Sequence, residues 1–256
     1  MPLEPSSVLL SDRVALVTGA AVGIGAATAV ALAAFGADVA VCDRDEVHLA
    51  AVAEEVKGLG RQCVSGILDV RQPDLVSEFC ARVARDLGRV DILVNNAGGG
   101  FRSDFVDVNT KGQDTLIQEN FGSVTYLIRS ALPFMPSGGS IINITSIEAH
   151  RAAPSFAVYS AMKAAVASLT KSLALELGPR LIRVNCIAPD VIPTPGIGDP
   201  PVRTPLPRKG SVDDVAAAVV FLAGDLSAFV TGSTIHVDGG NLAAGGWRRQ
   251  EDGWST

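Results

Sequence analysis

The stretch VALVTGAAVGIGAATAVALAAFGADVAVCD, residues 14–43, decides the fold. A short apolar run, Val14–Val17, enters a glycine-rich turn; an Ala-rich helical stretch follows over Gly25–Phe35, and a second apolar run covers Val39–Cys42. Short β-rich runs on either side of a helical stretch predict a βαβ unit. The beginning of the chain therefore indicates a parallel sheet.

The same alternation continues along the chain. Further strands are predicted at Gln62–Ile67, Ile92–Val94, Ser140–Thr145, Ile182–Ile187 and Ser233–Val237. Further helices are predicted at Val47–Leu59, Leu75–Leu87, about Thr115 to Phe134, Ala157–Leu177 and Val212–Ala223. Because βαβ units with right-handed crossovers build a doubly wound sheet, we expect the α/β class: a Rossmann-type parallel sheet with helices on both faces. The near-continuous apolar strands fit a sheet buried on both sides.

The composition fits one folded domain and argues against other classes. Of the 256 residues, 48% are apolar and 19% are charged, which excludes a disordered chain. The formal net charge is −6 and no run of lysines or arginines stands out, so neither nucleic acid nor an anionic membrane is an expected partner. The apolar segment Gly23–Cys42 is divided by a break at Gly36–Asp38, which favours a helix and a strand buried on a sheet over a membrane span.

Cysteine and histidine spacing points to neither a disulfide framework nor a metal site. No C-x-x-C pair occurs among Cys42, Cys63, Cys80 and Cys186, which we expect to be free thiols in a reducing compartment. No ligand spacing links His48, His150 and His236. Residues 1–12 lack the features of a signal peptide, so we expect a cytoplasmic protein.

The glycine-rich turn predicts a pyrophosphate site. It reads Gly19-Ala20-Ala21-Val22-Gly23-Ile24-Gly25, a G-x-x-x-G-x-G spacing. Glycines here let the backbone approach the anion, and the following helix directs its free N–H groups toward it. Asp43 follows the second strand, 18 residues past Gly25, close to the offset at which an acid binds the adenosine ribose hydroxyls. A carboxylate there repels a 2′-phosphate, which favours NAD over NADP, although the adjacent Arg44 could counter this.

Two other strand ends carry candidate cofactor contacts. Asp69-Val70 is read as the end of the third strand, where a carboxylate could meet the adenine amino group, and Asn96-Ala97-Gly98 follows the fourth. Open α/β sheets bind their ligands at the carboxyl ends of the strands.

Tyr159-Ser160-Ala161-Met162-Lys163 carries a more specific signal. With the features above, it resembles the short-chain dehydrogenase/reductase family, whose Y-x-x-x-K it matches, and the resemblance spans Val14 to Gly240. Residues at i and i+4 share a helix face, so we expect Lys163 to lie beside the phenol and the cofactor ribose and to lower the pKa of Tyr159. Ser146 and Asn120 match the family's serine and asparagine. The resemblance implies that Ser146 polarises the substrate oxygen and that Asn120 kinks its helix and orders a proton-relaying water.

The resemblance thus implies an NAD-dependent enzyme that interconverts a secondary alcohol and a ketone. Residues 1–256 would form one dinucleotide-binding catalytic domain, with its core at 12–240. A non-catalytic NAD(H)-binding or regulatory protein on the same fold is the alternative, although a sensor has no need of both Tyr159 and Ser146. A lyase or epimerase fits less well, since such enzymes tend to carry an added substrate domain. The family also implies a homotetramer.

The segment after the sixth strand departs from the family pattern. Pro189-Asp190 stands where the family usually has Pro-Gly, while Ile192 and Thr194 match the family's contacts to the carboxamide and phosphate side. Six prolines between 193 and 207 forbid a regular helix, and we expect 193–210 to form a stiff, open rim that admits a bulky apolar substrate such as a steroid-like ring system or an acyl thioester. The expected mouth of the site is formed by Glu148, Arg151, Gly99, Gly100 and Phe101. His150 is expected at the surface, and Tyr126 in the core or an interface.

The tail at 241–256 is expected to be an appendage. It holds both tryptophans of the chain, Trp247 and Trp254. It is either a surface tail or a clamp onto a neighbouring subunit.

Overall fold

A seven-stranded parallel sheet forms the centre of the molecule, with the strand order β3-β2-β1-β4-β5-β6-β7. The computed structural model describes residues 4–250 and 253–255. The strands of the sheet are β1 Val14–Thr18, β2 Asp38–Asp43, β3 Cys63–Ile67, β4 Ile92–Asn95, β5 Ser140–Ile144, β6 Arg183–Pro189 and β7 Thr234–Val237. The predicted Rossmann-type fold is confirmed, and each predicted strand is present to within two residues at either end.

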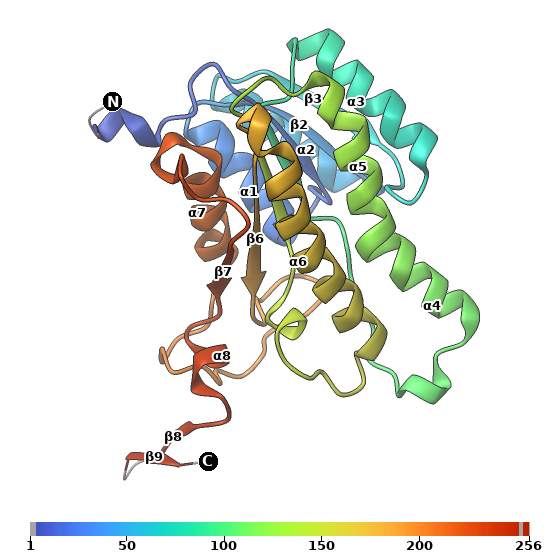
Figure 1. Cartoon of the computed structure of the whole chain (residues 1–256), viewed down its shortest axis with the longest axis vertical. Coiled ribbons are helices and arrows are strands. Elements are labelled where there is room, and N and C mark those ends of the chain that lie inside the picture. Colours follow the sequence, from blue (N-terminus) through green and yellow to red (C-terminus); the bar gives the residue numbers. More distant parts are fainter. Residues whose placement is uncertain (1–3, 251–252, 256) are drawn as a thin grey trace.

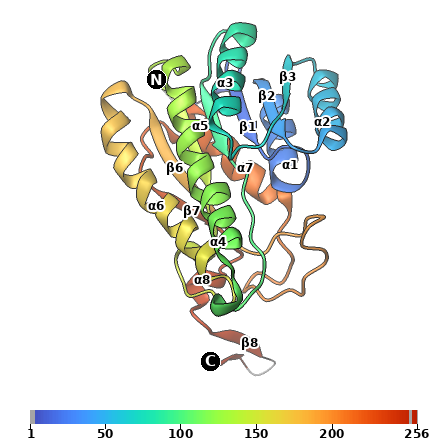
Figure 2. The ribbon, with the colours of Figure 1, turned by 90° about the vertical axis from the view of Figure 1, so that its right-hand side faces the viewer.

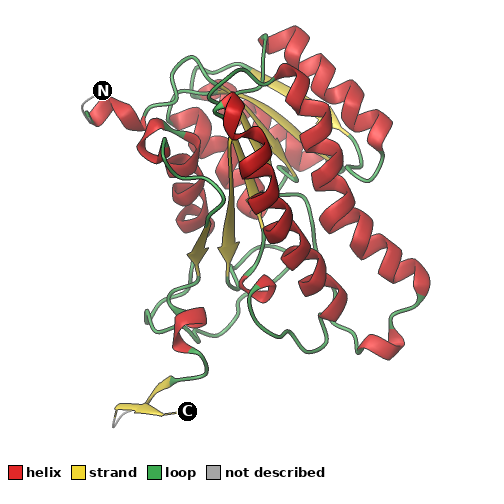
Figure 3. Ribbon diagram, viewed as in Figure 1, coloured by secondary structure: helices red, strands yellow, loops and turns green. Residues whose placement is uncertain are grey.

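Helices cover both faces of the sheet (Figures 1 and 3). One layer contains α1 Gly23–Ala34, α2 Glu46–Gly58 and α7 Val212–Ala223, which share one apolar core. The other contains α3 Pro73–Leu87, α5 Ser123–Ala131 and α6 Ala157–Leu177, which share a second core. Figure 2 shows α5 and α6 running side by side on this second face. Strands β1, β4 and β5 are buried throughout because both layers cover them.

One connection departs from the predicted right-handed rule. The β1–α1–β2 and β6–α7–β7 connections cross the sheet in opposite directions, yet α1 and α7 pack on the same face. The two crossovers therefore have opposite handedness. The β1–α1–β2 crossover follows the right-handed rule, and the β6–α7–β7 crossover does not. The segment 190–211 that precedes α7 is long enough to take the chain around the edge of the sheet, which removes the short-loop constraint behind the rule.

The helix predicted at about Thr115 to Phe134 is interrupted. Helix α4 covers Thr110–Ile117, a single π-helical turn covers Gln118–Gly122, α5 follows, and a 3₁₀ turn ends at Phe134. Within the π turn, the Asn120 amide nitrogen donates to Leu116 O at 3.0 Å. Side-chain donation to a backbone carbonyl competes with the regular helical ladder and favours such a bulge.

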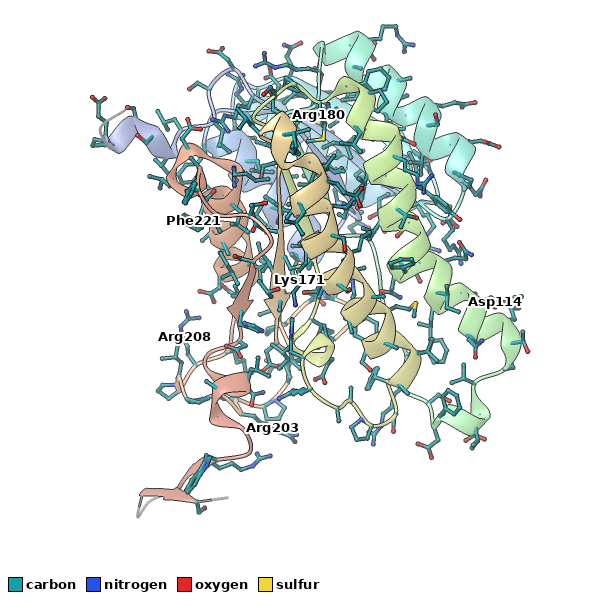
Figure 4. The ribbon with its side chains drawn as sticks, in the orientation of Figure 1. Asp114, Lys171, Arg180, Arg203, Arg208 and Phe221 are labelled. Carbon is teal, nitrogen blue, oxygen red and sulfur yellow. The ribbon has the colours of Figure 1, made fainter. Side chains whose placement is uncertain are left out.

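The segment 190–211 contains no helix or strand, as its prolines predict. It packs against the beginning of the short helix α8, Asn241–Ala244, where the Leu206 N–H donates to Gly239 O at 3.0 Å. Figure 4 labels two exposed arginines of this segment, Arg203 and Arg208.

The chain ends in an antiparallel ribbon of β8 Arg248–Gln250 and β9 Gly253–Ser255, which projects away from the body (Figure 1). The Trp247 side chain is 53% exposed, and that of Trp254 lies outside the described residues. The segment Gly23–Cys42 divides into α1 and β2, as predicted. In the part of the chain described, every helix is too short or too polar to cross a membrane.

Candidate active site

A cavity of about 790 Å³ opens at the carboxyl ends of the parallel strands. Most of the predicted cofactor and catalytic residues line it: Gly19, Val22, Gly23, Ile24, Asp43, Arg44, Asp69, Val70, Asn96, Ala97, Gly98, Ser146, Tyr159, Lys163, Pro189, Ile192 and Thr194. Gly25 and Asn120 are the two predicted residues that stand behind this lining. The structure thus gathers side chains from nearly every strand end into one site.

The glycine turn leaves no room for side chains. Gly19 has φ +63°, and a Cβ there would lie 2.8 Å from Ala97 Cα. A Cβ on Gly25 would lie 2.0 Å from Gly19 O. Thr18 holds the facing loop, because its Oγ1 accepts from the Asn96 and Ala97 N–H groups at 3.1 and 3.0 Å. Gly19 and Gly25 therefore let the backbone of this turn lie close to the loop after β4, at the edge of the cavity.

This geometry fits a dinucleotide. The N-terminus of α1 opens onto the cavity beside Gly23, where the helix dipole and free N–H groups favour a pyrophosphate. Asp43 stands at the end of β2, on the neighbouring strand. Its Oδ2 accepts from the Ala21 N–H at 3.0 Å, and its Oδ1 accepts from the N–H groups of Arg44 and Asp45 at 2.6 and 3.1 Å. Three backbone donors thus fix a carboxylate where ribose hydroxyls would lie.

Asp69 lies two residues beyond the end of β3, not at the end of the strand as predicted. The Arg71 Nε donates to its two oxygens at 2.9 and 3.0 Å, and the Arg71 N–H donates to Oδ1 at 3.0 Å. The Arg71 side chain holds the pKa of the Asp69 carboxyl below its ordinary value. The carboxylate faces the cavity already paired with a cation.

Ser146 and Tyr159 meet at the other end of the cavity. Ser146 follows β5 and caps a 3₁₀ turn, where its Oγ accepts from the Glu148 N–H at 3.2 Å. Tyr159 lies in the first turn of α6. Burial raises the pKa of the Tyr159 phenol, a hydrogen bond with Ser146 lowers it, and the negative charge of Glu148 raises it.

The expectation that Lys163 lowers the pKa of Tyr159 is wrong for the chain itself. The pKa of the phenol is raised, because desolvation dominates. The Lys163 Nζ lies 5.6 Å from the centre of the phenol ring and donates to Ile144 O at 3.0 Å. Lys163 is 4% exposed, and burial lowers the pKa of its ammonium to about 8, so it remains mostly charged at pH 7 and loses its proton as the pH rises above 8.

Asn120 lies against Lys163 across Gly98. A Cβ on Gly98 would meet Asn120 Oδ1 at 2.8 Å and Lys163 Nζ at 3.0 Å. Asn120 is fully buried; its amide nitrogen donates to Gly99 O at 2.8 Å, and its Oδ1 accepts from the Gly99 N–H at 3.1 Å. The π turn brings this side chain to the loop after β4, so all four predicted catalytic residues lie at one end of the cavity.

The prediction of the residues that form the mouth of the site is only partly correct. Glu148, Gly99 and Gly100 line the cavity, whereas Arg151 and Phe101 do not. Arg151 instead pairs with Glu148 at 2.9 Å and lies 3.9 Å from the Asp190 carboxylate. Sequence reasoning missed Arg102, Glu119, Phe156, Val191, Gly196 and Ile197, which the structure adds to the lining.

Asp190, the departure from the family pattern, is held by the C-terminal segment. The Asn241 Nδ2 donates to its Oδ2 at 2.7 Å, and the Asp190 N–H donates to Val237 O at 3.2 Å. Its side chain is 10% exposed. The carboxylate therefore ties the loop after β6 to the beginning of α8.

Residues outside the cavity agree with their predicted surroundings. His150 is exposed, with its ring 4.8 Å from that of His236. Tyr126 packs against the second core, and its hydroxyl donates to Gln118 Oε1 at 3.0 Å. The four cysteines are free thiols.

Known proteins share both the sequence and the fold. Residues 19–241 match a family described as enoyl-(acyl carrier protein) reductase. The 3-oxoacyl-(acyl-carrier-protein) reductase of Thermotoga maritima is 36% identical over 90% of this chain and 98% of its own length. Carveol dehydrogenase from Mycobacterium avium, solved with NAD, is 30% identical with a TM-score of 0.86 over 91% of this chain and 99% of its own. A short-chain dehydrogenase from Burkholderia cenocepacia, solved with NADP, is 34% identical with a TM-score of 0.87 over 90% and 98%.

Proposed function

The chain belongs to the short-chain dehydrogenase/reductase family of oxidoreductases, and we propose that it interconverts a secondary alcohol and a ketone with NAD(H). The observation that carries this proposal is that Ser146, Tyr159 and Lys163 line one cavity together, with the Lys163 Nζ 5.6 Å from the centre of the phenol ring, and that this cavity fits a dinucleotide. The whole chain would then act as one catalytic domain.

Each side chain of the site would have its own role in the reaction. A bound nicotinamide cofactor supplies or accepts the hydride. Tyr159 takes the proton from the alcohol oxygen during oxidation and returns it to the carbonyl oxygen during reduction. Ser146 donates to the same oxygen and orients it. Lys163 lies beside the phenol and is placed to bind the nicotinamide ribose, and Asn120 would order the water through which the proton passes on.

The preference for NAD rests on Asp43. Its carboxylate is fixed at the end of β2 by three backbone N–H groups, so it cannot move away from a 2′-phosphate without losing those bonds. Repulsion of that phosphate supports NAD over NADP. Because relatives solved with either cofactor are similar to this chain, the preference has to be measured directly.

The substrate is proposed to be bulky and apolar. Phe156, Val191 and Ile197 line the substrate end of the cavity, beside a rim without regular structure. One relative is named a 3-oxoacyl-(acyl-carrier-protein) reductase and one structural relative a carveol dehydrogenase, and these names support the proposed substrate class.

A homotetramer is proposed as the working assembly. Leu175 on α6 is 81% exposed, and Phe229, just before β7, is fully exposed. A subunit that covered these two side chains would remove their apolar surface from water. The C-terminal ribbon, which projects from the body, would then clamp onto a neighbouring subunit.

The test is NADH formation at 340 nm with NAD and a panel of secondary alcohols, including hydroxysteroids and 3-hydroxyacyl thioesters. Replacing Tyr159 by Phe should lower turnover by about 10²- to 10⁴-fold while leaving NADH binding intact. Tyr126→Phe, which changes the only other tyrosine of the chain, is the matched control and should retain activity. Oxidation should rise with pH in the wild type, because the pKa of Tyr159 is raised and only the phenolate accepts a proton. NADH binding without turnover on any alcohol would contradict the catalytic proposal and favour a binding protein.

A further inference from the structure

We propose that Glu119 is a second determinant of cofactor choice, because it holds Arg44 in an ion pair and so withholds that arginine from a 2′-phosphate. The proposal rests on the proposed function, since it concerns the adenosine end of the same cofactor site. The observation behind this proposal is that two segments far apart in the sequence lie side by side, one directly after β2 and the other in the π turn.

The ion pair joins two segments that both line the cavity. Arg44 directly follows Asp43, and Glu119 directly precedes Asn120 in the π turn. The Arg44 Nη2 lies 3.4 Å from the Glu119 Oε1. The Arg44 side chain is 58% exposed and the Glu119 side chain 22%. Arg44 is therefore the more solvent-exposed partner, and Glu119 the more buried one.

The π turn determines where Glu119 points. In this turn the Ser123 Oγ donates to Glu119 O at 2.6 Å, while the neighbouring Asn120 is anchored to the loop after β4. These two bonds fix the backbone on both sides of the Glu119 side chain. The carboxylate is thus presented to the cavity by a rigid element rather than by a loop.

Arg44 is the basic group best placed to receive a 2′-phosphate. An arginine near the acid at the end of the second strand is what accommodates this phosphate in dinucleotide folds. The other arginine at this end, Arg71, is engaged by both oxygens of Asp69. Among the described residues, the contact to Glu119 at 3.4 Å is the one that restrains the Arg44 guanidinium.

The balance of charge explains the direction of the effect. Asp43 places a fixed negative charge beside the ribose, so a dianionic phosphate there needs the Arg44 guanidinium as its counter-charge. Neutralising Glu119 releases that guanidinium, whose planar fork matches phosphate oxygens. Asp43 remains, so the change is a relaxation of the preference rather than a reversal.

The experiment is a binding cycle rather than an activity assay. Dissociation constants for NADH and NADPH are measured by fluorescence titration, at fixed low ionic strength, for the wild type, Glu119→Gln, Arg44→Ala and the double variant. Glu119→Gln should lower the dissociation constant for NADPH by about three- to tenfold and change that for NADH by less than about twofold. In the Arg44→Ala background, Glu119→Gln should have no such effect on NADPH.

Glu54→Gln is the matched control. Glu54 pairs with Lys57 on the exposed face of α2 and lies outside the cavity, so this variant changes net charge equally without touching Arg44. It should leave both constants unchanged. A gain in NADPH affinity that persists in the Arg44→Ala background would overturn the proposal, because Glu119 would then act by repelling the phosphate directly. No gain in Glu119→Gln would overturn it as well. A wild type that binds neither nucleotide would instead refute the proposed function.

Discussion

Replacing Lys163 by Met isolates the energetic cost of keeping an ammonium buried at the site. Lys163 is 4% exposed, its Nζ has Ile144 O as its hydrogen-bond partner at 3.0 Å, and burial lowers its pKa from 10.5 to about 8. The folded state therefore releases this proton at a lower pH than the unfolded state does. Methionine has a similar length and no charge, so it removes the titration while nearly conserving volume.

The magnitude follows from the difference in pKa. One pKa unit corresponds to about 1.4 kcal/mol, so a shift of about 2.5 units costs the folded protein about 3 kcal/mol below pH 8. Between pH 8 and 10.5 the unfolded chain binds more protons than the folded chain, so stability rises with pH. From pH 7 to pH 10, wild type should therefore gain about 2–3 kcal/mol of unfolding free energy relative to Lys163→Met.

The assay is urea denaturation at pH 7, 8.5 and 10, under reducing conditions and at constant protein concentration. The difference between wild type and variant at each pH cancels the titration of all other groups. Lys171→Met is the matched control, because Lys171 is exposed on the same helix, two turns further along (Figure 4), and its curve should run parallel to wild type. A difference for Lys163→Met that stays flat, or moves against the wild type as pH rises, would refute the argument that desolvation governs this lysine.

Two further substitutions test the packing around the cavity. Gly25→Ala should weaken NADH binding or stability by at least about 2 kcal/mol, because its Cβ would lie 2.0 Å from Gly19 O. Gly58→Ala is the control, since the new Cβ has open space around it. It should be neutral or stabilising in the same titration and melting experiments. Asp190→Gly, which introduces the residue usual in the family, should cost about 1–2 kcal/mol in urea denaturation because Asn241 loses its acceptor at 2.7 Å. It should also raise KM more than it lowers kcat, and an unchanged KM would show that this tether does not shape the substrate end.

The apolar pattern of the sequence predicted the bounds of helices and strands well where a single apolar face decides how the element packs. The bounds of α6 and α7 match the predicted Ala157–Leu177 and Val212–Ala223, and for α7 the capping box at Ser211 marks the beginning of the helix. The apolar pattern between Thr115 and Phe134 does not change at Asn120, so the interruption of this helix was predicted by the family resemblance, which implies a kink at Asn120, and not by periodicity. It depends on a carbonyl and an amide of the loop after β4, which only the folded chain brings within reach.

Within the site, residue types were easier to predict than their electrostatics. The i and i+4 spacing placed Lys163 near Tyr159, but spacing contains no information about burial, and burial decides the direction of both pKa shifts. The ion pair between Arg44 and Glu119 was missed for a related reason. The two residues are 75 positions apart and come from different layers of the structure, so no local pattern links them.

The π turn therefore connects the two ends of the cavity. Its Asn120 contacts the loop beside Lys163, where the proton is transferred, and the preceding Glu119 reaches Arg44, where the adenosine phosphate is distinguished. A regular helix rotates each residue by about 100°, so removing the extra residue of the bulge would turn both side chains away from their partners. A deletion that restores the α-helical ladder should consequently weaken both catalysis and cofactor selection. Glu119→Gln should affect cofactor selection alone. Coupling through one rigid turn, rather than through a mobile loop, explains how a chain can fix both properties with adjacent residues.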